Sequence, residues 1–170
     1  MIIETTIGNF EFIKIGTATR NKPPLKAKNI SDDYRLFLEL IDNKFLEAGQ
    51  SVYLILDEKN IIYVGYYSTS FKDRWWEKNG YFWHGDIVDN KIDILVREGR
   101  NITVWLSVDP YVRNNDGQFN ISKLLEDTLI MKYAKEYKYN DKLELINTTG
   151  KNLEKQQSKT KSVMEILNIK

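Results

Sequence analysis

The sequence predicts an α+β domain, in which strands and hairpins are interspersed with amphipathic helices. Two runs rich in β-branched and aromatic residues, 52–56 and 61–65, flank the turn-forming segment 57–60 and indicate a β-hairpin. The segments 32–48 and 122–137 carry apolar residues at helical spacing. With 170 residues, the chain suits a single domain with one substantial core.

The segments before this hairpin predict strands, a loop and a helix. Residues 2–16 alternate around a Gly-Asn pair, which predicts two strands or a loose hairpin. The segment 20–30 contains two prolines and is predicted to be a loop. Ser31 is a suitable N-cap for a helix over 32–48, and Gly49 is its stop signal. The apolar stripe of this helix consists of Tyr34, Phe37, Leu38, Ile41, Phe45 and Leu46.

The loop of the predicted hairpin decides where its two tyrosines point. Side chains alternate between the faces of a sheet, so a loop of two or four residues would place Tyr53 and Tyr63 on opposite faces. A three-residue loop over 58–60, with Asn60 in the left-handed conformation, places both on one face. We predict this three-residue loop.

The second half of the chain predicts alternating helices and strands. Ser70 is the predicted N-cap of a helix over 71–79, with Asp73 completing a capping-box-like start. Phe71 and Trp75 share one face of this helix, and Arg74 and Lys78 share another. The remaining predictions are a helix over 84–98 ending near Gly99, a strand over 102–108 stopped by Asp109-Pro110, a helix over 122–137 capped by Asn120 or Ser122, a short strand over 143–146, and a tail over 151–170 that is helical at its end.

Composition restricts the classes of function. The chain has no cysteine, which excludes disulfides and cysteine metal sites and fits a cytoplasmic protein. It shows no secretory signal and no apolar run near the ~20 residues needed to span a bilayer, so we expect no membrane association. The net charge of +1 requires a nucleic-acid binder to gather its basic residues on one face. Two basic clusters, within 20–28 and 151–161, serve that purpose or are simply solvated.

Glu126 is the first candidate for chemistry. In a helix its neighbours at i+3, i+4 and i+7 are Leu129, Ile130 and Tyr133, so its carboxylate points toward an apolar flank. Burying an unpaired charge costs roughly several kcal/mol of free energy, so the carboxylate needs a partner. A hard divalent cation such as Mg²⁺ is one possibility, and pairing with a lysine at the edge of the apolar stripe is the plainer one.

Several short motifs follow one another along the chain: Ser51-Val52-Tyr53, Tyr63-Val64-Gly65 and Phe71-Lys72-Asp73-Arg74-Trp75, and then Glu126 and Asn147. In this order they resemble the GIY-YIG nuclease family, over roughly residues 51–150. The first two strings stand where the family has Gly-Ile-Tyr and Tyr-Ile-Gly, and the third resembles its helix with the catalytic arginine. The resemblance has departures: Ser51 replaces the first glycine, and Lys78 stands where the family often has histidine, although some restriction-type members also have lysine there.

The resemblance implies a compact, largely antiparallel sheet with helices packed around it, and metal-dependent hydrolysis of DNA. Glu126 is expected to hold one Mg²⁺ or Mn²⁺ per active site. Tyr53 is expected to take a proton from the attacking water, and Tyr63 to position that water or the phosphate. Arg74 and Lys78 are expected to contact phosphate oxygens, and Asn147 to brace the site.

Each of these residues also has a plainer interpretation. The tyrosines fit a hairpin core, Arg74 and Lys78 fit an exposed helix surface, and Asn147 fits a turn. His84 lies outside the transferable positions, and a structural or N-cap-region role is favoured over contact with substrate. Trp76, Tyr81, Phe82 and Trp83 form an aromatic cluster suited to a core or to wedging against bases.

Size and missing modules select among the nucleases of this family. A single domain over 1–170, with a core at 51–150, an extension at 1–48, an insertion at 79–100 and a tail at 151–170, is most similar to a type II restriction endonuclease. Cutting a short symmetric site in double-stranded DNA favours a homodimer. The alternatives are a less specific DNase, such as a toxin or phage nuclease, and a catalytically silent DNA-binding module.

Overall fold

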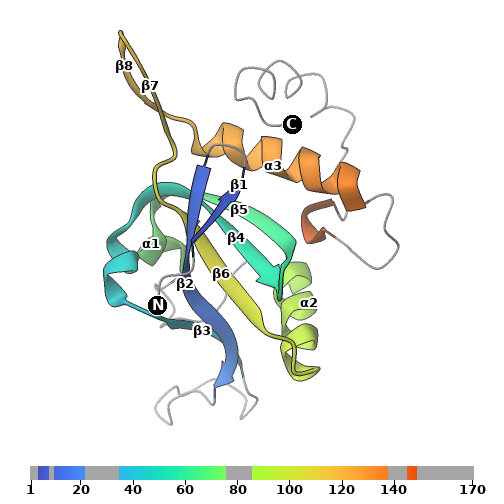
Figure 1. Ribbon diagram of the computed structural model, residues 1–170. Coiled ribbons are helices and arrows are strands. Elements are labelled where there is room, and N and C mark those ends of the chain that lie inside the picture. The colour runs from blue at the N-terminus through green and yellow to red at the C-terminus, as the bar shows by residue number, and fades with distance from the viewer. Residues whose placement is uncertain (1–3, 8–9, 22–34, 76–85, 138–144, 149–170) are drawn as a thin grey trace.

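A curled antiparallel sheet with helices on both faces forms the body of the protein (Figure 1), as the α+β prediction requires. The computed structural model describes residues 4–7, 10–21, 35–75, 86–137 and 145–148. The strand order is β1-β2-β6-β4-β5, and β3 pairs with the same edge of β2 as β1 does. The strands are β1 (Glu4–Ile7), β2 (Phe10–Asn21), β3 (Arg35–Leu40), β4 (Gly49–Asp57), β5 (Asn60–Ser70) and β6 (Ile102–Ser107).

Two long helices cover opposite faces of this sheet. Ile92 of α2 lies in one hydrophobic cluster, together with Tyr53 and Ile55 of β4. Leu125 and Leu129 of α3 lie in the other, against the opposite face of β4. The helical elements are η1 (Asn43–Glu47), α1 (Phe71–Trp75), α2 (Asp86–Arg97), α3 (Ser122–Tyr137) and η2 (Ile146–Thr148). None of the helices in the described ranges has the length and apolar run needed to cross a bilayer.

The central strand β4 is buried on both faces, which explains its continuous run of apolar residues. Every residue from 51 to 57 is buried. Val52, Leu54 and Leu56 point toward α3, whereas Tyr53 and Ile55 point toward α2. A strand covered on both faces has no reason to alternate apolar and polar residues. β4 is therefore the centre of the core.

Tyr53 and Tyr63 share a face, as predicted, but the predicted loop is wrong. Asp57 pairs with Asn60, so the loop has two residues, and Glu58 takes the positive φ of 55° that we expected at Asn60. A two-residue loop alone would put the two tyrosines on opposite faces. A β-bulge reverses this, because the register shifts between Ile55 and the next residue of β4. One extra residue in β5 turns every later side chain to the other face, which restores the shared face.

Contacts with the loop before β6 hold this tight turn. Arg100 forms two hydrogen bonds with the Asp57 carboxylate, from Nε at 3.1 Å and from Nη2 at 2.6 Å. The Glu58 N–H donates to the carbonyl oxygen of Asn101 at 3.1 Å. These contacts stabilise a left-handed conformation that glutamate rarely adopts.

The predicted helix over 32–48 is wrong in its described part, which forms β3 and η1. Leu36 and Leu38 are buried and Glu39 is exposed, so the segment alternates as a strand does. Its residues pair with 16–21 of β2, whose edge is open beyond β1. The apolar spacing fits a helix, but pairing with the open edge of β2 determines that the segment forms a strand. The expected cap Ser31 and the stripe residue Tyr34 lie outside the described residues.

Most other predicted elements are confirmed. β1 and β2 form the N-terminal hairpin, α2 ends before Gly99 (φ 78°), and β6 matches the predicted strand. Asn120 Oδ1 accepts the Ser122 N–H at 2.9 Å and caps α3. The predicted strand over 143–146 is wrong where it is described, since Ile146 begins η2. The positions 76–85, with Lys78, His84 and the aromatic cluster, and the tail 151–170 lie outside the described residues.

A second hairpin was not predicted from the sequence. β7 (Tyr111–Asn114) and β8 (Gly117–Asn120) form a separate two-stranded ribbon that projects from the body beside α3 (Figure 1). Asn115 and Asp116 form the two-residue loop between these strands, and the Asp116-Gly117 sequence at the start of β8 is a hairpin signal that could have revealed it.

Gly65 gives the Tyr53 ring the space it occupies. A Cβ at position 65 would overlap Cζ and Oη of Tyr53 and would stand 2.6 Å from its Cε1. β5 is the edge strand, and Gly65 pairs with Tyr53 across the hairpin. The missing side chain therefore lets the phenol lie across β5 and reach the edge of the sheet.

We expect Gly65→Ala to destabilise the protein by about 1–3 kcal/mol, because Tyr53 must leave its position in a close-packed core. Gly49→Ala is the matched control, since a Cβ there meets nothing within 4 Å. Urea denaturation of both variants measures the difference. Equal stabilities would contradict this account of Gly65.

Candidate active site

Three tyrosines of the hairpin gather on one face of β4 and β5. The ring of Tyr53 lies 6.1 Å from that of Tyr63 and 6.4 Å from that of Tyr67, between centroids. Tyr53 is fully buried, whereas Tyr63 is half-buried. Tyr63 is therefore the phenol of this pair that solvent can reach.

Arg74 meets the end of the Tyr53 phenol. Helix α1 begins directly after β5, and Ser70 Oγ accepts the Asp73 N–H at 3.1 Å, so the predicted cap is confirmed. The Arg74 guanidinium donates a hydrogen bond to the Tyr53 hydroxyl. Burial lowers the pKa of Arg74, but the neighbouring Tyr53, Tyr63 and Glu126 outweigh it and raise this pKa overall. Arg74 remains a cation.

Burial keeps Tyr53 protonated. Removal from water raises the pKa of its phenol well above the ordinary value, and Tyr63 raises it further. Arg74 acts in the opposite direction and stabilises the phenolate, while Glu126 destabilises it. Desolvation dominates these effects, so Tyr53 is a neutral hydrogen-bonding group in the free protein.

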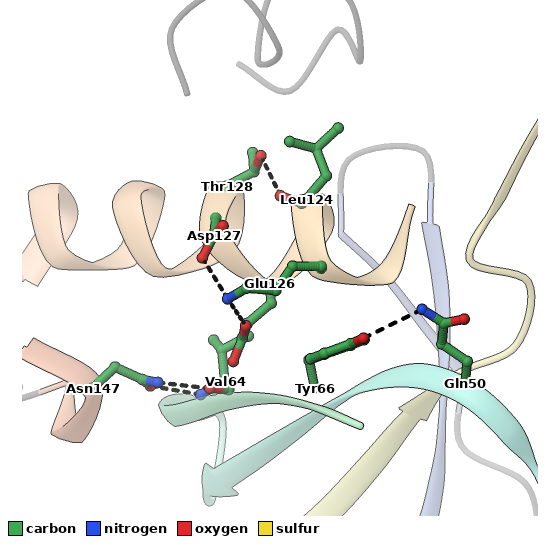
Figure 2. Close-up of polar contacts among 9 residues, drawn as sticks. Gln50, Val64, Tyr66, Leu124, Glu126, Asp127, Thr128 and Asn147 are labelled. Atoms are coloured by element: carbon green, nitrogen blue, oxygen red, sulfur yellow. Dashed lines mark hydrogen bonds and ion pairs between the residues drawn. The ribbon is translucent and has the colours of Figure 1, made fainter. Parts of the chain in front are cut away.

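Glu126 points from α3 toward β5, near Val64 and Tyr66 (Figure 2). The residue is 8% exposed, so the inward orientation expected from its helical spacing is confirmed. Its Oε2 lies 2.5 Å from Nζ of Lys123, one helical turn earlier. The plainer interpretation, pairing with a lysine, therefore also describes this state. Because Tyr53 and Arg74 both respond to the Glu126 charge, the carboxylate belongs to the same cluster.

Asn147 braces the edge strand. Its Oδ1 accepts the Val64 N–H at 2.7 Å, and its Nδ2 donates to the Val64 carbonyl oxygen at 2.6 Å (Figure 2). These are the two bonds that a neighbouring strand would make with the free edge of β5. Val64 lies between Tyr63 and Gly65, so Asn147 holds the backbone under both tyrosines.

A surface hollow of about 230 Å³ lies next to Arg74, where β5 continues into α1. Its walls carry hydroxyl groups and the Arg74 cation, which are groups that bind phosphate oxygens, together with the Asp73 carboxylate, which repels them. The lining residues are Tyr66, Tyr67, Ser68, Thr69, Asp73 and Arg74.

The donor set at Glu126 suits a cation that keeps most of its water. Within the described ranges, no group of three or more acidic or histidine side chains could enclose a metal ion. Mg²⁺ commonly binds through one or two carboxylates together with water and substrate phosphates. A buried carboxylate that already attracts an ammonium group fits that mode, so Glu126 is a suitable single ligand.

The structure brings together Tyr53, Tyr63, Arg74 and Glu126 at one edge of the sheet. Asn147 binds the backbone of the edge strand β5 beside them. Lys78 lies outside the described residues. Two neighbours of the cluster, Lys123 and Tyr67, were not predicted as site residues. The i, i+3 spacing of Lys123 to Glu126 and the even spacing of Tyr67 from Tyr63 were the available signals.

Comparisons with protein-family models, with curated proteins and with solved structures found no match to this chain.

Asn147→Ala should lower the free energy of unfolding by about 2–4 kcal/mol, because it leaves the Val64 N–H and carbonyl without their partners in a buried place. Asn101→Ala, at an exposed position, is the control and should cost under about 0.5 kcal/mol. Chemical denaturation measures both. A stable Asn147→Ala protein would show that Asn147 does not brace β5.

Stability should fall with rising pH above about 10. Unfolded tyrosines ionise there, whereas the raised pKa of Tyr53 keeps its proton bound in the folded state, so the unfolded state binds fewer protons and is favoured. One such group contributes a slope of up to about 1.4 kcal/mol per pH unit. Tyr53→Phe should therefore show a shallower decline than the wild type in denaturation series from pH 9 to 11.5. Parallel declines would mean that Tyr53 titrates normally.

Proposed function

We propose that the protein is a metal-dependent DNA endonuclease of the GIY-YIG type. The observation that supports the proposal is the meeting of Tyr53, Tyr63, Arg74 and Glu126 at one edge of the sheet, beside a hollow suited to phosphate. These residues come from β4, β5, α1 and α3 and are up to 73 positions apart, from 53 to 126. Packing of these four elements into one core does not by itself bring two phenols, a guanidinium and a carboxylate together, so their convergence supports a functional site.

Arg74 binds the scissile phosphate in this proposal. The hydrogen bond with Tyr53 fixes the guanidinium at the edge of the hollow. A planar guanidinium contacts two phosphate oxygens at once and neutralises charge as it develops. Because Tyr53 is neutral and buried, its main role is to orient Arg74.

Tyr63 contacts the attacking water. It is the half-buried phenol, and its ring lies against Tyr53. Tyr63 acts after losing its own proton to solvent: the water oxygen attacks phosphorus, the bond to the 3′ oxygen breaks, and the water proton passes to the Tyr63 phenolate. The leaving 3′ oxygen takes a proton from solvent. Assigning this proton to Tyr53 alone, as the sequence suggested, adds the cost of ionising a buried group to the roughly 4 kcal/mol of a free phenol at neutral pH.

Glu126 supplies the metal ligand. When a divalent cation is bound, it supplies charge stabilisation at the scissile phosphate and the leaving oxygen. The burial of Glu126 orients the carboxylate toward β5, and Asn147 keeps β5 in place.

The specific form that we propose is a type II restriction endonuclease. The size of the chain favours this form. Cutting both strands of a short symmetric site favours a homodimer acting on double-stranded DNA. The projecting β7–β8 ribbon and the parts outside the core are the candidates for sequence recognition.

Plasmid cleavage with Mg²⁺ tests the proposal. Wild-type protein should cut DNA, whereas Glu126→Gln and Arg74→Ala should each lose at least about 10²-fold in rate. Glu136→Gln, at an exposed position on the same helix, is the matched control and should remain active. Discrete fragments indicate restriction, and a smear indicates a less specific DNase. Absence of Mg²⁺-dependent cutting by a folded wild type would refute the enzyme and leave a silent DNA-binding module.

A further inference from the structure

Lys123 lies between two carboxylates at the start of α3. Its Nζ is 2.5 Å from Oε2 of Glu126 and 2.9 Å from Oδ1 of Asp127. The spacing i, i+3 and i, i+4 places all three side chains on neighbouring parts of one helical face. One ammonium group therefore serves two acids.

The two acids differ in how much they need this cation. The Glu126 side chain is 11% exposed, whereas that of Asp127 is 29% exposed and that of Lys123 is 58% exposed. The more buried carboxylate loses more hydration and depends more on a counterion. Asp127 retains water and can accept the ammonium at little cost.

We propose that Lys123 is the resident counterion of Glu126, and that it moves to Asp127 when a divalent cation binds. This inference rests on the proposed role of Glu126 as metal ligand. An ammonium and a divalent cation repel each other at one carboxylate oxygen, so the two compete. Asp127, already at hydrogen-bond distance, gives the displaced ammonium a partner without rearrangement of the backbone.

Competition and structural support predict opposite results. If Lys123 only held Glu126 in place, its removal would loosen the ligand and weaken metal binding. If Lys123 competes with the metal, its removal should strengthen metal binding. The sign of the change in affinity therefore decides between these roles.

Mn²⁺ binding to the full chain without DNA, measured by electron paramagnetic resonance of the free ion, tests the proposal. Lys123→Met should bind Mn²⁺ about fivefold more tightly than the wild type, a modest effect because Lys123 is largely exposed. Lys123→Arg keeps the positive charge and should bind Mn²⁺ no more tightly than the wild type. Lys135→Met removes a charge from an exposed position on the same helix and should change the affinity by less than about twofold.

Two further variants identify the partners. Glu126→Gln should abolish the Mn²⁺ site in the wild-type and Lys123→Met backgrounds. Asp127→Asn should weaken Mn²⁺ binding, because the displaced ammonium then has no second acid, and the effect should shrink in the Lys123→Met background.

Unchanged or weaker Mn²⁺ binding by a folded Lys123→Met protein would overturn the proposal, as would absence of binding by both proteins. DNA cleavage is a separate measurement. Tighter binding in Lys123→Met without cleavage by the wild type would refute the nuclease and leave the counterion exchange standing. Cleavage by the wild type with unchanged Mn²⁺ affinity in Lys123→Met would refute the counterion exchange and leave the nuclease standing.

Discussion

The passage of the Tyr53 ring across Gly65 is the constraint on which the candidate site depends. Tyr53 lies in the central strand β4, which pairs with β6 on one side and β5 on the other. Its phenol ends over the backbone of the edge strand β5. The rigid core thereby fixes a polar group at the boundary where α1 and α3 approach the sheet. Arg74 of α1 donates a hydrogen bond to the phenol, and the Glu126 carboxylate of α3 is close enough for its charge to destabilise the phenolate. A side chain at position 65 would close this route, so the glycine is required for the site as well as for packing.

Local signals in the sequence predicted the parts of this arrangement that lie within one element. The Ser70 cap, the inward orientation of Glu126 and the hairpin that carries both tyrosines depend on spacing within a few residues, and the structure has all three. The shared face of the tyrosines was predicted for a reason that proved wrong. The turn is shorter than expected because Arg100 and Asn101 hold it, and these residues lie about forty positions away. A bulge in β5 adds the one residue that the shorter turn lacks, so both tyrosines still share a face.

Tertiary pairing explains what the sequence did not predict. Residues 35–40 satisfy a helical and a strand pattern equally well, and the free edge of β2 decides between them through its open hydrogen-bonding groups. The same reasoning applies to Asn147, whose side chain completes the edge of β5 in place of a strand. Neither outcome follows from propensity, because each depends on which backbone groups the rest of the fold leaves unpaired. The convergence of four side chains from four elements is likewise a property of the topology.

The carboxylates at this edge outnumber its cations in the absence of substrate. Arg74 and Lys123 provide two positive charges, Glu126, Asp127 and the Asp73 of the hollow provide three negative charges, and Tyr53 is neutral because burial raises its pKa. A DNA phosphate held by Arg74 would add negative charge that Arg74 alone does not balance. A divalent cation at Glu126 would add the opposite charge, and transfer of the Lys123 ammonium to Asp127 would keep both acids paired. On the proposed function, metal and DNA therefore favour each other's binding, since each supplies the charge that the other leaves unbalanced.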